Sequence, residues 1–137
     1  MADVVDKATR SRMMSGIQAK DTLPELQVRS VLHRAGFRFQ MHRRDLPGKP
    51  DLVLPKYHVA IFVNGCFWHQ HAGCGLAAVP KTNKKFWQVK LSGNVARDKR
   101  VRARLRRAGW HAFTIWECET NEHGLSKLMS KIARAVQ

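Results

Sequence analysis

The sequence predicts a single α/β domain with a central mixed β-sheet flanked by helices. The chain has 137 residues, of which 44% are hydrophobic, and this suits one ordered domain with one core. Short strand-like apolar runs alternate with longer helical patterns, in the order helix, three strands, helix, strand, helix. No internal repeat or linker divides the chain, so residues 1–137 are expected to form one domain.

Two helices are predicted in the first part of the chain. A short helix is expected over residues 11–18. A second begins at Thr22, which can cap it, with Pro24 in the first turn and Glu25 completing a capping box. Gly36 is a C-terminal stop signal for this helix. Its apolar stripe consists of Leu26, Val28, Val31, Leu32 and Ala35.

Three strands are predicted next. Residues 37–42 alternate apolar and polar side chains, which is typical of a half-buried strand. After a loop at residues 46–50, residues 51–54 and 58–64 form two strands joined by a turn at residues 55–57. The last of these strands is apolar on both faces, which indicates a central position in the sheet.

The second half of the chain predicts a loop, a long helix, a strand and a final helix. The loop covers residues 65–84, the long helix residues 85–108 and the strand residues 110–117. The apolar positions of the long helix have imperfect helical spacing: Phe86, Val89, Leu91, Val95, Val101 and Leu105. The final, amphipathic helix is marked by Leu125, Leu128, Met129, Ile132 and Val136.

The charge balance favours a polyanionic partner. Lys and Arg number 25 against 10 Asp and Glu, giving a net charge of +15. Such an imbalance is typical of nucleic-acid binders; the alternative is a solvated basic surface, which would carry self-repulsion without a partner to offset it. No signal peptide or membrane-spanning run is visible, so a cytoplasmic protein with reduced thiols is expected.

The three cysteines and a histidine predict a structural zinc site. Cys66, His71 and Cys74 lie in one loop, and Cys118 follows the last strand. Zinc favours four sulfur and imidazole ligands in closed structural sites. His69 is an alternative to His71 as the fourth ligand, and three buried free cysteines are the alternative to a metal site.

A second group of residues suits phosphodiester hydrolysis. Asp51, at the start of a strand, is a candidate ligand of Mg2+, which prefers hard oxygens. Glu25 could join it or hold a metal-bound water, and His69 is a candidate general base because imidazole titrates near neutrality. Taken alone, Asp51 could be a turn residue after proline, and Glu25 could serve only the capping box.

Several motifs together resemble one family. They are Asp21-Thr22-x2-Glu25, Leu46-Pro-Gly-x-Pro-Asp51, Phe62-Val-Asn-Gly-Cys-Phe-Trp-His69, Phe86-Trp87, Asn94-x3-Asp98 and Trp116-Glu-Cys118. Over about residues 6–118 the chain resembles the bacterial very-short-patch repair (Vsr) mismatch endonucleases. The resemblance implies a nuclease core related to type II restriction enzymes, a structural zinc, and Mg2+-dependent nicking beside a T:G mismatch, the product of 5-methylcytosine deamination.

The resemblance also implies residue roles. Asp51 and the backbone carbonyl of Val63 would bind Mg2+, with His69 as general base and Glu25 beside them. Zinc would be held by Cys66, His71, Cys74 and Cys118. The DNA-contacting residues would be Phe67, Trp68 and Trp87 from the major groove, Met14 of an N-terminal segment (residues 1–20) from the minor groove, and Lys90 and Asn94 near the mismatch.

The chain departs from restriction-type cores at one point. These cores usually place an acidic-x-Lys pair on the second strand, where this chain reads Val63-Asn64-Gly65. The task of that lysine therefore falls to His69. Some relatives have histidine where this chain has Asn64.

Insertion of Phe67, Trp68 and Trp87 into the duplex as an aromatic wedge has its own physical rationale. Inserting apolar side chains between base pairs costs a few kcal/mol of unstacking per step, and least at a mismatch. The alternative is that Trp68 and Trp87 belong to the core.

Two other functions remain open at this point: a non-catalytic zinc-containing DNA-binding module, and a restriction-type nuclease without mismatch specificity. The expected partner is double-stranded DNA that contains a mismatch. Mismatch-repair proteins are further candidate partners. The chain is expected to act as a monomer, associated with the nucleoid and not with a membrane.

Overall fold

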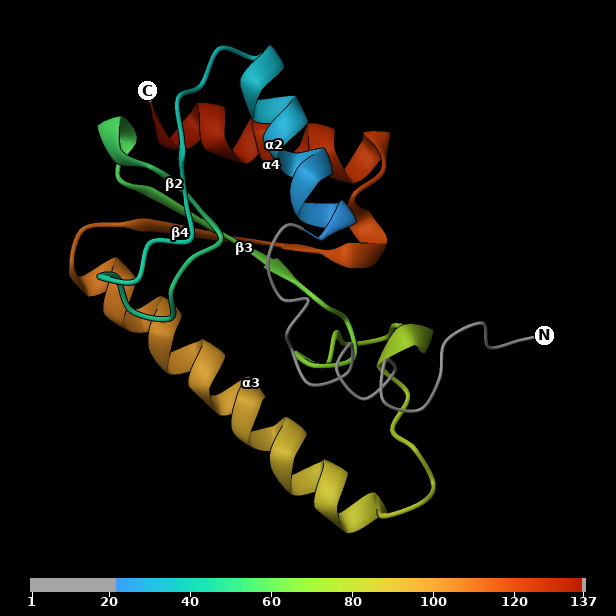
Figure 1. Ribbon diagram of the computed structural model, residues 1–137. Coiled ribbons are helices and arrows are strands. Elements are labelled where there is room, and N and C mark those ends of the chain that lie inside the picture. Colours follow the sequence, from blue (N-terminus) through green and yellow to red (C-terminus); the bar gives the residue numbers. More distant parts are fainter. Residues whose placement is uncertain (1–21, 137) are drawn as a thin grey trace.

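The computed structural model describes residues 22–136 and contains one mixed β-sheet in that range (Figure 1). The strand order is β1-β2-β3-β4. The strands are β1 (Gln40–Met41), β2 (Leu52–Leu54), β3 (Val59–Asn64) and β4 (His111–Trp116). The first three pair antiparallel, whereas β3 and β4 run parallel, so the prediction of a mixed sheet is confirmed.

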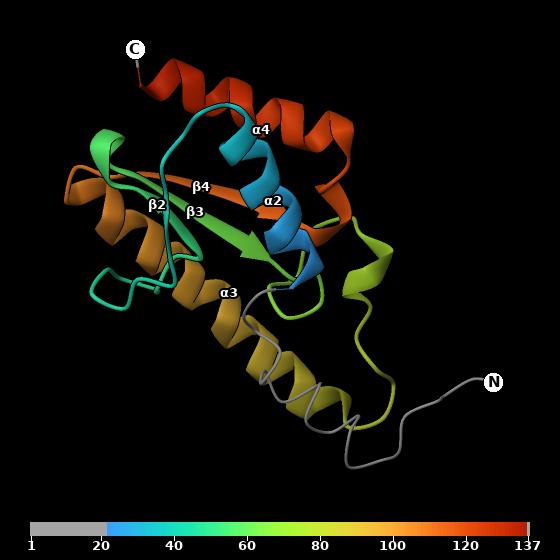
Figure 2. The same cartoon turned by 45° about the horizontal axis from the view of Figure 1, so that its top comes forward.

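Three α-helices cover the two faces of this sheet in the described part of the chain. They are α2 (Leu23–Arg34), α3 (Lys84–Arg107) and α4 (Glu122–Ala135). Figures 1 and 2 show α2 and α4 on one face and α3 on the other. The order of elements confirms the predicted α/β class, since α3 provides the crossover that joins parallel strands.

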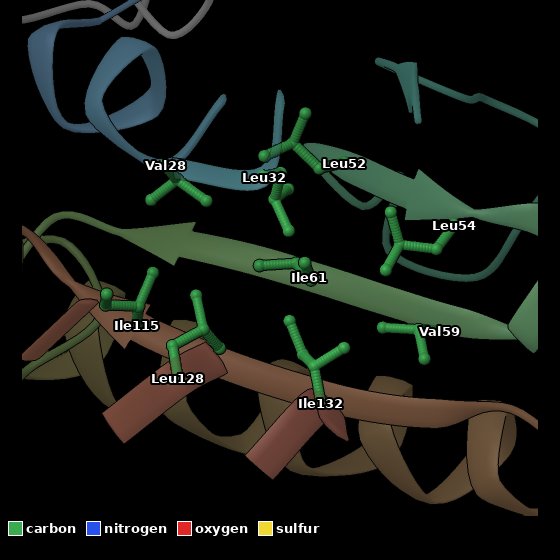
Figure 3. Packing of buried hydrophobic residues seen from close by; sticks show 9 residues of the cluster. All are labelled: Val28, Leu32, Leu52, Leu54, Val59, Ile61, Ile115, Leu128 and Ile132. Atoms are coloured by element: carbon green, nitrogen blue, oxygen red, sulfur yellow. The ribbon is translucent and has the colours of Figure 1, made fainter. Parts of the chain in front are cut away.

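The main core lies between the sheet and the α2–α4 layer (Figure 3). Alternate residues of β2, β3 and β4 face this layer, because successive strand side chains point to opposite faces. The buried members of the cluster are Val28, Leu32, Leu52, Leu54, Val59, Ile61, Ile115, Leu128 and Ile132. Burial of a large aliphatic side chain contributes about 1.5–3 kcal/mol, so this cluster is the main stabilising contact of the fold.

A smaller cluster packs α3 against the opposite face of the sheet. Ala60 and Ala112 contribute from the sheet and Leu105 from the helix. The predicted apolar stripe of α3 is only partly a core stripe, because Phe86 is 58% exposed and Val89 is 69% exposed. The N-terminal half of α3 extends beyond the sheet in both views, so these side chains have no sheet to cover them (Figures 1 and 2).

The strand predicted over residues 37–42 is mostly wrong. Only Gln40–Met41 pairs as a strand, at the edge of the sheet, and Met41 is 48% exposed. Phe37 and Phe39 pack against the main core without strand pairing. His42 has a left-handed backbone conformation with φ 55°, which turns the chain away from regular strand geometry.

The Thr22 cap of α2 is confirmed, and its predicted apolar stripe is confirmed in part, since Val28 and Leu32 are buried. The Thr22 hydroxyl accepts a hydrogen bond from the Glu25 N–H at 3.4 Å. Leu26 is exposed, whereas the charged Glu25 is buried with the core residues of the helix. The buried face of the helix therefore begins with a carboxylate.

The predicted helix at residues 11–18 and the contact residue Met14 lie outside the described residues. Within residues 22–136, no helix combines the length and the apolar character needed to cross a membrane.

Candidate active site and zinc centre

Asp51 directly precedes β2, where its half-buried carboxylate meets the backbone of β3. Its Oδ2 atom accepts a hydrogen bond from the Val63 N–H at 2.7 Å. Burial raises the pKa of the Asp51 carboxyl to about 7; the Val63 N–H opposes this rise, and the nearby charge of Glu25 adds to it. Two acidic groups placed this close, one of them with a strongly raised pKa, are typical of a cation-binding or catalytic site.

Glu25 reaches the same place from the first turn of α2. Its side chain is only 2% exposed. The Arg29 guanidinium, one helical turn later, donates from Nη2 to Glu25 Oε2 at 3.1 Å. In Figure 2 the start of α2 lies close to the arrowhead of β3. Glu25 is therefore both part of the helix start and a member of the site, as the two compatible predictions allowed.

His42 completes this group, although the sequence does not predict it as a site residue. The ligand atoms of Glu25, His42 and Asp51 all lie within 4.8 Å of one another. His42 Nε2 is 3.8 Å from Glu25 Oε2. The His42 N–H also donates to the Asp51 carbonyl at 3.1 Å, continuing the β1–β2 pairing by one residue. The register between β1 and β2 is the signal that could have identified His42, since it places residue 42 opposite residue 51.

His69 lies outside the Glu25–His42–Asp51 group and pairs with Asp98 of α3. Its Nδ1 atom is 2.7 Å from Asp98 Oδ2, and the two side chains are 33% and 23% exposed. A carboxylate on Nδ1 favours the tautomer with its proton there, so Nε2 is the nitrogen that can accept a proton. Asp98 belongs to a motif of the resembling family, but the sequence alone assigns it no role.

Cys66, His71, Cys74 and Cys118 come together as predicted. Their ligand atoms lie within 4.8 Å of one another. His71 Nδ1 is 3.7 Å from Cys66 Sγ and 3.3 Å from Cys118 Sγ, and the Cys74 and Cys118 sulfurs are 3.9 Å apart. Zn–S bonds of about 2.3 Å give a tetrahedron with S···S edges of about 3.8 Å. The four residues therefore fit a zinc ion, and His71 rather than His69 is the imidazole of this set.

Neighbouring groups hold the four candidate zinc ligands in place. The His71 ring stacks on Trp116, with centroids 4.2 Å apart and planes at 10°. The Cys66 N–H donates to Glu117 Oε1 at 2.9 Å. Burial raises the pKa of the Cys66 thiol to about 12. Because zinc binds the thiolate, metal binding at this site would release a proton.

An aromatic cluster joins the site loop to the N-terminal part of α3. The Phe67 ring lies 5.0 Å from that of Trp68 and 5.5 Å from that of Trp87, and Phe86 and Trp87 are 5.2 Å apart. Lys90 places its ammonium 5.9 Å from the Trp68 ring centroid. These aromatic residues are partly or largely exposed and are absent from both core clusters. Such a cluster is available to stack on nucleic-acid bases.

Asn94 ties the cluster to α3, because its Nδ2 atom donates to the Trp68 carbonyl at 3.0 Å. A shallow depression, largely open to solvent, follows this part of the helix. The side chains along it come from α3: Lys85, Phe86, Val89, Lys90, Gly93, Asn94, Arg97 and Arg100. The helix carries ten Lys and Arg residues and one acidic residue, Asp98, so its surface favours a polyanion.

Comparison with known proteins agrees with this chemistry. Residues 2–74 match the family DNA mismatch endonuclease Vsr. The DNA mismatch endonuclease Vsr of Escherichia coli is 46% identical over 118 residues, which cover 86% of this chain and 75% of that protein. The type II nicking enzyme V.XorIIP of Xanthomonas oryzae pv. oryzae is 43% identical over 124 residues, 90% of each chain. The type II nicking enzyme V.NmeAIP of Neisseria meningitidis is 36% identical, covering 99% of this chain and 100% of that protein.

The family match spans more than half of the chain, and the E. coli relative is similar over most of it. Two neighbouring carboxylates, a histidine held by a carboxylate and a basic surface are the groups that a DNA-cleaving hydrolase needs. The chain therefore belongs to the Vsr family of DNA mismatch endonucleases.

Proposed function

We propose that this protein nicks one strand of duplex DNA next to a T:G mismatch, by Mg2+-dependent hydrolysis of a phosphodiester bond. The observation that carries the proposal is the group formed by Asp51, Glu25 and the Val63 backbone in a chain of the Vsr family. A T:G mismatch is the product of 5-methylcytosine deamination, so this activity would begin very-short-patch repair.

Asp51 and Val63 would hold the Mg2+ ion. A residue in an extended strand directs its N–H and C=O toward the same edge. The Val63 N–H donates to Asp51 Oδ2, so that edge of β3 faces the carboxylate. Carboxylate and carbonyl oxygens are the ligands that Mg2+ prefers. When bound, the ion would polarise the scissile phosphate and offset the charge that develops on it.

His69 would act as the general base. With Asp98 on its Nδ1 atom, Nε2 can take the proton of the attacking water. Position 65, two residues after Val63, is a glycine where restriction-type cores usually have lysine, so proton transfer depends on this imidazole. Glu25 would orient water beside Asp51.

The aromatic cluster would read the mismatch. Phe67, Trp68 and Trp87 would enter the duplex from the major-groove side, with Lys90 and Asn94 beside the mismatched pair. Met14, outside the described residues, would enter from the minor groove. A mismatched step costs least to unstack, so insertion favours mismatched over paired DNA.

The remaining groups would have structural and assembly roles. Zinc on the cysteine–histidine set would join the loop after β3 to the residues after β4, which supports a small domain. We further propose a restriction-endonuclease-like core, a monomer on DNA, and mismatch-repair proteins as partners.

Incubation with supercoiled plasmid that carries one T:G mismatch tests the proposal. Relaxed circles should form with Mg2+ and not with chelator, and Asp51→Asn should abolish their formation. Binding without nicking under both conditions would indicate a non-catalytic zinc-containing DNA-binding module. Equal cleavage of the fully paired plasmid would indicate a nuclease without mismatch specificity.

A further inference from the structure

Arg29 lies between Glu25 and His42 at distances typical of hydrogen bonds. Its Nη2 atom is 3.1 Å from Glu25 Oε2 and 3.2 Å from His42 Nε2. The same two acceptor atoms are 3.8 Å apart. One guanidinium nitrogen therefore contacts both a carboxylate oxygen and an imidazole nitrogen that could otherwise ligate a metal ion.

The chemistry of arginine defines this arrangement. A guanidinium keeps its charge in proteins and has only donors. The Arg29 Nη2 group carries two protons, one for Glu25 Oε2 and one for His42 Nε2, so His42 acts as an acceptor. The arginine thus neutralises the Glu25 carboxylate and engages the oxygen that lies toward the site.

The backbone holds His42 in this position. Its N–H donates to the Asp51 carbonyl at 3.1 Å, and its left-handed conformation (φ 55°) turns the chain directly after β1. The backbone next to the imidazole is therefore fixed relative to β2, and His42 contacts the same Arg29 nitrogen as Glu25. Arg29 is itself fixed by the helical spacing of four residues from Glu25.

We propose that Arg29, supported by His42, is a positioning residue that keeps Glu25 from binding the divalent cation directly, so that the cation is held on the Asp51 side of the group. This inference rests on the proposed function, because it concerns the same cation. Glu25 would then act on the cation only through water, and Arg29 and His42, which the proposed mechanism does not use, would hold Glu25 in this role.

Titration of the zinc-loaded, full-length protein with Mn2+ tests the inference without DNA. The electron paramagnetic resonance signal of free Mn2+ reports binding, and Asp51→Asn defines the part that belongs to this site. Glu25→Gln should leave the Mn2+ Kd within about twofold of wild type. Arg29→Met should lower the Kd by about tenfold or more, a change of the size that groups contacting metal ligands produce.

The double variant Arg29→Met/Glu25→Gln separates ligation from simple removal of charge. If Glu25 becomes a ligand once Arg29 is gone, the gain in affinity should disappear in the double variant. If the gain persists, it comes from the lost positive charge alone, and the inference is wrong.

Two other results would also overturn the inference. One is a Kd raised about tenfold both by Glu25→Gln and by the double variant, in which no Arg29 charge is left without its carboxylate partner. The other is a similar loss of affinity in His42→Ala with no effect of Arg29→Met, which would make His42 a metal ligand. Nicking of mismatched plasmid is measured separately, so its absence would count against the proposed function and leave the Mn2+ result standing.

Discussion

Asp98 is expected to affect the rate of nicking through His69, although it would contact neither the metal ion nor the scissile phosphate. Its Oδ2 atom lies 2.7 Å from His69 Nδ1, a distance typical of a charge-assisted hydrogen bond. Asp98→Ala removes the group that sets the tautomer and the orientation of the imidazole. The expected effect is slower proton transfer with an intact fold and intact DNA binding.

The structure bounds the size of this effect. Hydrogen bonds to charged groups contribute about 1.5–3 kcal/mol. Both side chains are partly exposed, at 33% and 23%, which favours the lower half of that range. A loss of about 1.5–2 kcal/mol corresponds to about a 10- to 30-fold lower single-turnover rate.

Single-turnover nicking and filter binding on one T:G duplex measure the two effects. Asp98→Ala also raises the net charge by one, so Glu122→Ala, an exposed change of equal charge in the first turn of α4, is the matched control. The control should nick at the wild-type rate. Nicking by Asp98→Ala at the wild-type rate would refute the role of Asp98. Weaker DNA binding that accounts for the whole loss of nicking rate would show that Asp98 acts on binding and not on proton transfer.

Three further predictions concern the zinc, the buried carboxylate and the aromatic cluster. Cys118→Ser should lose the bound zinc and melt at a lower temperature, and chelation should lower the melting temperature of wild type but not of the variant, because structural zinc contributes folding free energy. In metal-free protein, the protonated Asp51 carboxyl should add to the free energy of unfolding below about pH 4. This contribution should be lost as the pH rises through about 7, since burial raises the pKa of this carboxyl. The loss is at most about 4 kcal/mol, and thermal melting of Asp51→Asn should show a flatter profile than wild type; parallel profiles would contradict the assignment. Trp68→Ala should reduce the preference for T:G over paired DNA by about 5- to 150-fold, since base stacking on an aromatic ring contributes about 1–3 kcal/mol. An equal loss on both duplexes would instead indicate a structural role.

The elements that the sequence predicts well are those with a single dominant pattern. The run Val59–Asn64 is apolar on both faces and forms the central strand between β2 and β4. The helix starting after Thr22 has a local signal, a capping hydroxyl, that does not depend on the rest of the fold. Local signals of this kind survive in the structure because no tertiary contact opposes them.

Where tertiary contacts decide, the sequence is less informative. The alternation in residues 37–42 suggests a strand, but the edge of the sheet pairs only Gln40–Met41. The apolar side chains Phe86 and Val89 fit a core stripe, yet α3 extends beyond the sheet and leaves them exposed. Periodicity records which faces are apolar, and not what covers them.

The residues of the candidate site also differ in how well the sequence predicts them. The cysteine–histidine set could be predicted because all four residues have one shared chemistry and little alternative use. Arg29, His42 and Asp98 could not, since each is a common surface residue type whose role comes from a partner distant in sequence or on another element. His42 meets Asp51 through strand pairing, and Asp98 meets His69 across the helix–loop contact.

The proposed activity is the cutting of one DNA strand at a T:G mismatch. Single-turnover nicking of two duplexes with the same sequence, one with T:G and one with C:G at a single position, tests it most directly. With Mg2+, we predict a single nick in the strand that carries the T, formed about 100-fold faster than any cut in the paired duplex, because unstacking a paired step costs a few kcal/mol more. Equal rates on the two duplexes, or cleavage that persists in chelator, would contradict the claim.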